Sequence, residues 1–418
     1  MSRRYGSRGC FRRAGFRTRI GTSRFDNLNF EHLALTEGRM KRKVYGAVIL
    51  LLVGLAFEFA ASRVYAASAG LTTAKKQSEA KGFIFEENRA DIIAKAKQQG
   101  AKIRVLSSLD PGLFPHMTAS FKKKYPFLDV TMVEITGLDA NERFLLELKA
   151  GVVRDFDVVQ LSPERYPEYL PYAKKFDILG MAEQGVLGIE PKMVDPKNRT
   201  VVSLATVLFV GAYNKNLLPA DKVPTTWEGF LKPEFKGRKM MVDIRPIMYS
   251  TFAACPDQGL GVEWMVNYAQ KIRAQEPIWV RGYSRTLTSM NAGEYALHSG
   301  VYYHTVMRLM QKLPQNNLEL KFIEPVPATL FEAEMVLNSS RNPHGGLLFL
   351  EHQASAEGQK VIDEREPLKA SLYYPGSVAA NQLKGKRVCL NSYDTLQLSS
   401  GWEKKAVEAF GLPVAEVK

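Results

Sequence analysis

Short apolar segments alternate with amphipathic segments from residue 100 onward, and this alternation limits the choice of fold most strongly. The stretches 103–106 and 129–135 are apolar and as short as strands. Between them, Met117, Phe121 and Tyr125 recur every four residues, which places them on one face of a helix. Strands that alternate with helices at this spacing predict a parallel sheet with helices on both faces, in the α/β class.

The same pattern continues to the end of the chain and divides it into two lobes. Long strands predicted at 201–213 and near 320–327 are expected to cross between the lobes. The first lobe then comprises 83–207 plus 325–418 and the second 208–324, each a mostly parallel sheet flanked by helices. The chain is also too long for one compact core. Further strands are predicted at 156–161, 238–244, 295–303 and 321–326, and further helices at 86–99, 142–148, 263–273, 305–312, 346–356 and 401–410.

Residues 40–66 have the composition of an export signal. A basic start is followed by the apolar run 44–61 and by Val64 and Ala66, which suit the −3 and −1 positions of a cleavage site. The mature protein then begins at Ala67. A cleaved signal predicts a periplasmic protein.

An uncleaved membrane anchor and a buried core helix are the alternatives for this segment. Glu58 and Arg63 leave an apolar run shorter than the ~20 residues that a spanning helix needs. Residues 1–39 are irregular and Arg-rich, which indicates either a translation start assigned upstream of Met40 or a targeting extension. The stretch 67–82 is interpreted as a solvated linker.

The formal net charge of +14 is concentrated near the N-terminus, because residues 67–418 carry only +5. This small excess of positive charge does not indicate a surface that binds nucleic acid. The mature chain holds two cysteines, Cys255 and Cys389, which lie far apart in sequence. We expect two buried free thiols, and a disulfide is the alternative because export makes it chemically possible.

Several segments resemble, in the same order, the ferric-iron-type extracellular solute-binding proteins of ABC importers. They are the paired serine 107–108 ahead of a Lys-Tyr-Pro turn, the strand 156–159, the stretches 213–215, 223–228 and 232–238, the tandem tyrosine 302–303 after Asn-Ala-Gly-Glu, and Asn-Pro-His at 342–344. The resemblance implies a type II periplasmic-binding-protein fold that holds a small solute between two lobes and delivers it to a permease with its ATPase. It implies no cofactor, and a cargo of ferric iron with a synergistic anion or of an anionic organic solute.

Hydroxyl and acidic side chains follow the first and third predicted strands. Ser107 and Ser108 precede a helix, where hydroxyls and backbone N–H groups form a seat for an anion. A simple helix cap is the alternative. Asp110 either caps the helix or binds a cationic group or a metal. Ser162 ends the third strand, where side chains of open α/β sheets face a ligand.

Arg245 follows the strand 238–244, and Ser250 and Thr251 are expected to open the next helix. An arginine beside a hydroxyl-capped helix start binds a carboxylate or phosphate through paired hydrogen bonds. The resemblance places an anion-contacting loop at this helix start. A surface arginine next to an ordinary cap is the alternative.

Tyr302 and Tyr303 end a predicted strand, where the resemblance places the tandem tyrosine ligands of ferric iron. Ferric iron is a hard ion that suits oxygen donors. The alternatives are an aromatic wall for an organic solute and packing in the core, and the first loop lacks the histidine ligand of iron-binding relatives. His298 and His304 flank the pair, but the alternation of side chains along a strand argues against a joint metal site.

The sequence contains no nucleophile elbow, zinc-protease motif, cysteine nucleophile motif or phosphate loop. We therefore expect a receptor and not an enzyme, and we expect a monomer. The alternatives are a periplasmic enzyme on the same fold and a membrane-anchored sensor ectodomain.

Overall fold

The computed structural model describes residues 70–365 and 369–412. The predicted export signal at 40–66 and the extension before it lie outside these residues. Residues 70–80 form a helix, so the prediction of a linker over 67–82 is wrong there. Leu71 and Ala74 pack against the hydrophobic core that contains Ile92, Phe121 and Phe349. Ser78 is buried as well, because helical spacing brings the three residues to one face of the helix.

Three parallel strands form one end of the sheet. They are β1 (Lys102–Ser107), β2 (Asp129–Glu134) and β3 (Val158–Leu161), in the order β2-β1-β3. The predicted helix between the first two is confirmed as α3 (Phe114–Lys124), and its predicted inward residues Met117, Phe121 and Tyr125 are buried. This half also contains helices α2 (Arg89–Gln99), α4 (Leu138–Lys149), α5 (Tyr166–Tyr169), α6 (Ile178–Glu183), α11 (Pro343–Ala354) and α12 (Ala356–Arg365). The predicted α/β class is confirmed.

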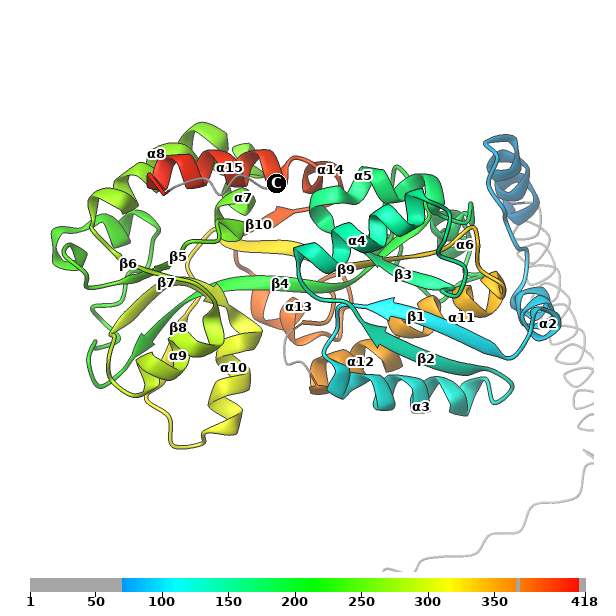
Figure 1. The fold of residues 1–418 in the computed structure, drawn as a ribbon, viewed down its shortest axis with the longest axis horizontal. Coiled ribbons are helices and arrows are strands. Elements are labelled where there is room, and N and C mark those ends of the chain that lie inside the picture. Colours follow the sequence, from blue (N-terminus) through cyan, green and yellow to red (C-terminus); the bar gives the residue numbers. More distant parts are fainter. Residues whose placement is uncertain (1–69, 366–368, 413–418) are drawn as a thin grey trace, which may run out of the picture. The chain divides into compact units, whose positions relative to one another are not determined.

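Two long antiparallel strands, β4 (Val201–Asn214) and β9 (Val326–Val336), run through the middle of the sheet (Figure 1). The strand order is β2-β1-β3-β9-β4-β7-β5-β6. β10 (Val388–Asn391) pairs with β9, and β8 (Leu318–Lys321) pairs with β4. The strand predicted at 321–326 is wrong: this stretch joins β8 to β9.

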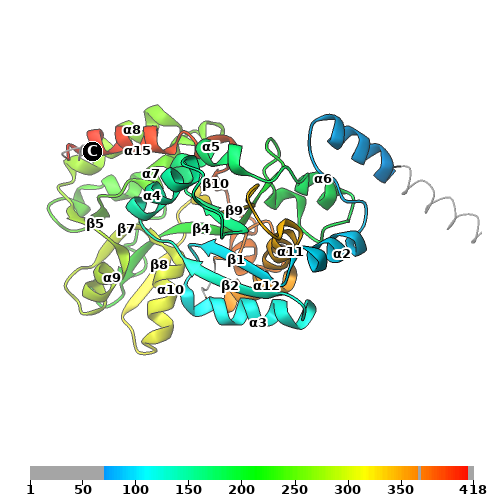
Figure 2. The same ribbon diagram turned by 45° about the vertical axis from the view of Figure 1, so that its right-hand side comes forward.

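The other half of the sheet contains β7 (Leu297–Tyr302), β5 (Met241–Asp243) and β6 (Ile278–Val280). Its helices are α7 (Ile247–Ala253), α8 (Val262–Ala274), α9 (Tyr283–Asn291) and α10 (Tyr303–Lys312). The C-terminal helix α15 (Ser399–Phe410) packs on α7 and α8 (Figure 2). The ring centroids of Phe410 and Tyr249 are 4.8 Å apart. Two lobes joined only by two strands would need two crossings of the chain. Here the chain also crosses on the way to α15. The predicted lobe boundaries stay a prediction.

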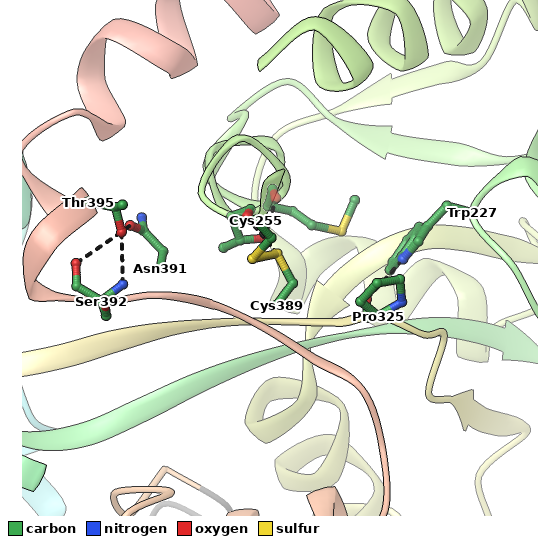
Figure 3. Close-up of a disulfide and its surroundings, with 9 residues drawn as sticks. Trp227, Cys255, Pro325, Cys389, Asn391, Ser392 and Thr395 are labelled. Carbon is green, nitrogen blue, oxygen red and sulfur yellow. Dashed lines mark hydrogen bonds between the residues drawn. A yellow bond between two sulfur atoms is a disulfide. The ribbon is translucent and has the colours of Figure 1, made fainter. Parts of the chain in front are cut away.

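A disulfide joins Cys255, which follows α7, to Cys389 on β10 (Figure 3). The expectation of two free thiols is therefore wrong. The two residues are 134 positions apart in sequence, and their proximity depends on β10 returning to pair with β9 beside α7. In the same region the indole Nε1 of Trp227 donates to the carbonyl oxygen of Pro325 at 3.1 Å. The bridge fastens the C-terminal part of the chain to the half that carries α7.

Replacing both cysteines by serine is expected to lower the free energy of unfolding by about 2–5 kcal/mol, because the bridge closes a long loop in the unfolded chain. Urea denaturation of the double variant and of the oxidised wild type measures the difference. The wild type under reducing conditions is the matched control and should behave like the variant. Equal midpoints for the oxidised wild type and the variant would contradict the expectation.

A buried carboxylate connects α2 to α11. Glu86 accepts hydrogen bonds from Lys95 Nζ at 2.7 and 2.6 Å, and its Oε1 lies 2.9 Å from Nε2 of His344. The hydrogen bond to His344, followed by that to Lys95, lowers the pKa of Glu86 to about 2. Asn342, the N-cap of α11, accepts from Gly345 N at 2.8 Å. The network fixes how α11 begins.

Because the pKa of Glu86 is depressed in the folded protein, its stabilising effect is present above about pH 4.5 and is lost as the pH falls towards 2. Wild type should therefore lose more stability between pH 5 and 2.5 than Glu86→Gln. Thermal unfolding across this range measures it. Glu79→Gln, at an exposed position of the helix of residues 70–80, is the control and should follow the wild type. Parallel curves for wild type and Glu86→Gln would rule the effect out.

Candidate functional site

Arg245 lies two residues beyond β5 and is held from two sides. Its Nε and Nη2 donate to the carboxylate of Asp243 at 3.0 and 2.6 Å, and its guanidinium lies 4.6 Å from the ring centroid of Tyr283. The backbone N of Gly282 also donates to Asp243, at 3.2 Å. These bonds raise the pKa of Arg245, which stays charged. Among the described residues, Nη1 of Arg245 has no hydrogen-bond partner.

Tyr302, the last residue of β7, lies in the same aromatic group. Its ring centroid is 4.5 Å from that of Tyr283, 5.1 Å from that of Phe209 and 5.2 Å from that of His304. The side chain is half-buried. Tyr283 thus touches both Arg245 and Tyr302, and the structure brings these two predicted site residues together.

His304 stacks on Tyr302 because α10 begins at Tyr303, so the alternation expected of a strand no longer holds. The imidazole is buried and its Nδ1 has no hydrogen-bond partner. Burial, followed by the charges of Lys369 and Arg308, holds the pKa of His304 well below its usual range. His304 is therefore neutral at physiological pH and lies among cations.

Arg308 on α10 connects this region to the loop after β1. Its Nη1 lies 3.6 Å from Oδ2 of Asp110. The other carboxylate oxygen of Asp110 accepts from Gly112 N at 2.9 Å and caps the turn Pro111–Leu113. Asp110 thus acts as a cap and also faces a cation from the opposite half of the sheet. Arg308 also acts by its charge on His304, whose ring stacks on that of Tyr302.

The predicted anion-binding site at Ser107 and Ser108 is occupied by the carboxylate of Glu332, a residue of the same chain. Ser107 Oγ donates to Oε1 of Glu332 at 2.6 Å, and Ser108 N donates to the same oxygen at 2.8 Å. Ser108 Oγ donates to Oε2 of Glu332. Nothing in the sequence pattern distinguishes Glu332 as a partner of this turn, since 224 or more residues separate them.

A second carboxyl group lies next to Glu332 on the same strand. Glu334 is buried, and burial together with the charge of Glu332 raises its pKa well above its usual range. Gln353 Nε2 donates to Oε2 of Glu334 at 2.6 Å. The two carboxyl groups therefore lie close together, and this environment favours the protonated form of Glu334.

Three predicted site residues have other roles in the structure. Ser250 and Thr251 lie inside α7, which begins at Ile247, so the prediction that they open this helix is wrong. Their hydroxyls donate to the carbonyl oxygens of Ile247 and Met248 at 2.8 and 2.6 Å. Tyr303 is buried, packs on Phe322 at 5.3 Å between ring centroids, and has its pKa raised to about 12 by burial.

Ser162 directly follows β3 and is buried, and its predicted contact with a ligand stays a prediction. Within residues 70–365 and 369–412, no group of three or more His, Cys, Asp or Glu side chains is arranged to hold a metal ion. A cavity of about 680 Å³ lies elsewhere, beside α12 and α13 (Val378–Leu383), and contains none of the predicted site residues. Its lining residues are Ala356, Glu357, Lys360, Asp363, Glu364, Tyr374, Gly376 and Val378.

Two α/β halves that share two long central strands, with polar side chains at strand ends of both halves, form the fold of the type II periplasmic binding proteins. Residues 181–388 match the model of the bacterial extracellular solute-binding proteins, and the chain belongs to that family. It is therefore a solute-binding protein.

Solved structures with the same fold include iron-bound HitA from Pseudomonas aeruginosa (15% identity, TM-score 0.54, 74% of this chain and 99% of that chain). IdiA (FutA) from Trichodesmium, in complex with iron and citrate, shares 18% identity, with a TM-score of 0.55 over 74% of this chain and 98% of that chain. The substrate-binding protein of an ABC transporter from Agrobacterium tumefaciens shares 17% identity, with a TM-score of 0.58 over 74% and 94%. No curated protein matches the sequence significantly. None of the described helices combines the length and apolar character that crossing a membrane requires.

Proposed function

We propose that this protein captures a small anionic organic solute between its two lobes and delivers it to the permease and ATPase of an ABC importer. The observation that carries the proposal is the guanidinium of Arg245, fixed by Asp243 and Tyr283 next to Tyr302, with Nη1 available. A donor that is already ordered loses little conformational entropy when a ligand binds.

The charges and aromatic rings near Arg245 favour a ligand that combines an anionic group with an apolar organic part. Arg308 and Lys369 act as positive charges on the buried His304, and the ring of His304 stacks on that of Tyr302. Asp243 and Asp110 offset part of this charge, which suits a solute of low negative charge. The rings of Tyr283 and Tyr302 offer apolar faces to the remainder of the solute.

The proposal includes export, lobe closure and the absence of catalysis. The predicted signal at 40–66 and the disulfide between Cys255 and Cys389 support a periplasmic location, because such bridges persist in oxidising compartments. The contact of Arg308 with Asp110 supports closure around the solute, since it joins the two halves. We propose a monomer that acts as a receptor and not as an enzyme.

Arg245→Ala is expected to weaken binding of the cargo by roughly 10-fold or more, because a hydrogen bond to a charged group is lost. A thermal-shift screen of organic acids and phosphonates against the wild type identifies the cargo, and its affinity is then measured for each variant. Arg285→Ala, at an exposed position of α9, is the matched control and should bind normally. Equal affinities of Arg245→Ala and the wild type would remove Arg245 from the site.

Ferric iron is the second candidate cargo, because Tyr302 presents a half-buried phenol and the resemblance places an iron ligand there. Packing of Tyr303 and the lack of a described acidic or histidine cluster argue against it. We expect protein purified without chelators and incubated with ferric citrate to remain colourless and to hold no iron by elemental analysis. A phenolate-to-iron absorption band that Tyr302→Phe abolishes would establish iron instead.

A further inference from the structure

We propose that the turn after β1 is a carboxylate-binding site that this chain fills with its own Glu332. By filling the site, Glu332 excludes the anionic group of a solute from the Ser107–Ser108 turn. The second part of this inference rests on the proposed function, whereas the first part does not.

The donors around Glu332 have the arrangement of a built carboxylate site. Two hydroxyls and one backbone N–H, all from Ser107 and Ser108, converge on its two oxygens. Ser107 Oγ in turn accepts from Leu109 N at 3.3 Å, which fixes the direction of its own hydrogen. Ser107 and Glu332 are both buried, and Ser108 is half-buried. The donors are therefore aimed at one carboxylate position in a nearly water-free place.

Glu332 adopts a backbone conformation that is unfavourable for its residue type. Its φ is +48°, in the left-handed region that glycine occupies more readily than other residues. The ladder to β4 pairs Phe331 with Ala205 and Ala333 with Ser203, and Glu332 forms no pair. A regular strand has neither the positive φ nor the missing pair. The hydrogen bonds between the Glu332 carboxylate and the serine turn compensate for the cost of this backbone conformation.

The occupied donors of the serine turn exclude a second anion. The Glu332 carboxylate already accepts from both serine hydroxyls and from Ser108 N. Burial together with Glu332 raises the pKa of Glu334 beside it well above its usual range. A solute carboxylate at the serine turn would have to displace Glu332 or lie against it, and both are unfavourable. The anionic group of the cargo is therefore directed to Arg245 in the other half of the sheet.

Chemical rescue tests the site with acetate as the probe. Glu332→Gly removes the carboxylate and also relieves the positive φ, so this variant has the best chance to fold. Acetate at 1–100 mM should raise its Tm saturably by roughly 1–3 °C. Glu332→Gln, which keeps the seat filled, and the wild type should show no such rise. Adding Ser108→Ala to Glu332→Gly should weaken the effect.

An equal response of Glu332→Gly and Glu332→Gln to acetate would overturn the proposal. If Glu332→Gly unfolds in ordinary buffer, recovery of folded protein in acetate would support the site, and failure in both buffers would count against it. All variants keep Arg245. Any rise in Tm from acetate bound at Arg245 is therefore the same in every variant and does not affect the comparison. Loss of cargo binding in Arg245→Ala is measured separately, which keeps failure of this inference distinct from failure of the proposed function.

Discussion

The antiparallel pairing of β4 with β9 is the interaction on which the rest of the structure depends. All fourteen residues of β4 are buried, and β9 is buried except at Phe331, which is half-buried. The strands of one half attach to β9 through β3, and those of the other half attach to β4 through β7 and β8. Movement of one half relative to the other would therefore have to bend these two strands.

Charged side chains near the candidate site are paired inside the protein before any ligand arrives. Asp243 holds Arg245, and the serine turn holds Glu332. Such pairs avoid the cost of burying an isolated charge. They also fix the direction of the remaining donors. The two halves differ as a result: one holds a fixed guanidinium, and the serine turn of the other holds a carboxylate.

Helices and strands with a clear apolar period could be predicted from the sequence, because the spacing of apolar residues is a local property of the chain. The positions of Met117 and Phe121 on α3 follow from spacing alone, because the inward face of a helix repeats every three to four residues. Most of β9 was missed, since Glu332 and Glu334 interrupt its apolar run. Those carboxylates are tolerated by partners from distant segments, Ser107 and Gln353, which local reasoning does not supply.

The sequence by itself determined the α/β class, the family resemblance and the residue types near the site, because periodicity and short motifs are local properties of the chain. Arg245, Tyr302 and Asp110 were predicted as site residues in this way, and their part in binding stays a prediction. Only the tertiary structure decided which groups meet. The disulfide, the stacking of His304 on Tyr302 and the occupation of the serine turn by Glu332 each join segments that no local rule relates. Sheet pairing and helix boundaries set these contacts, and both depend on how the whole chain packs.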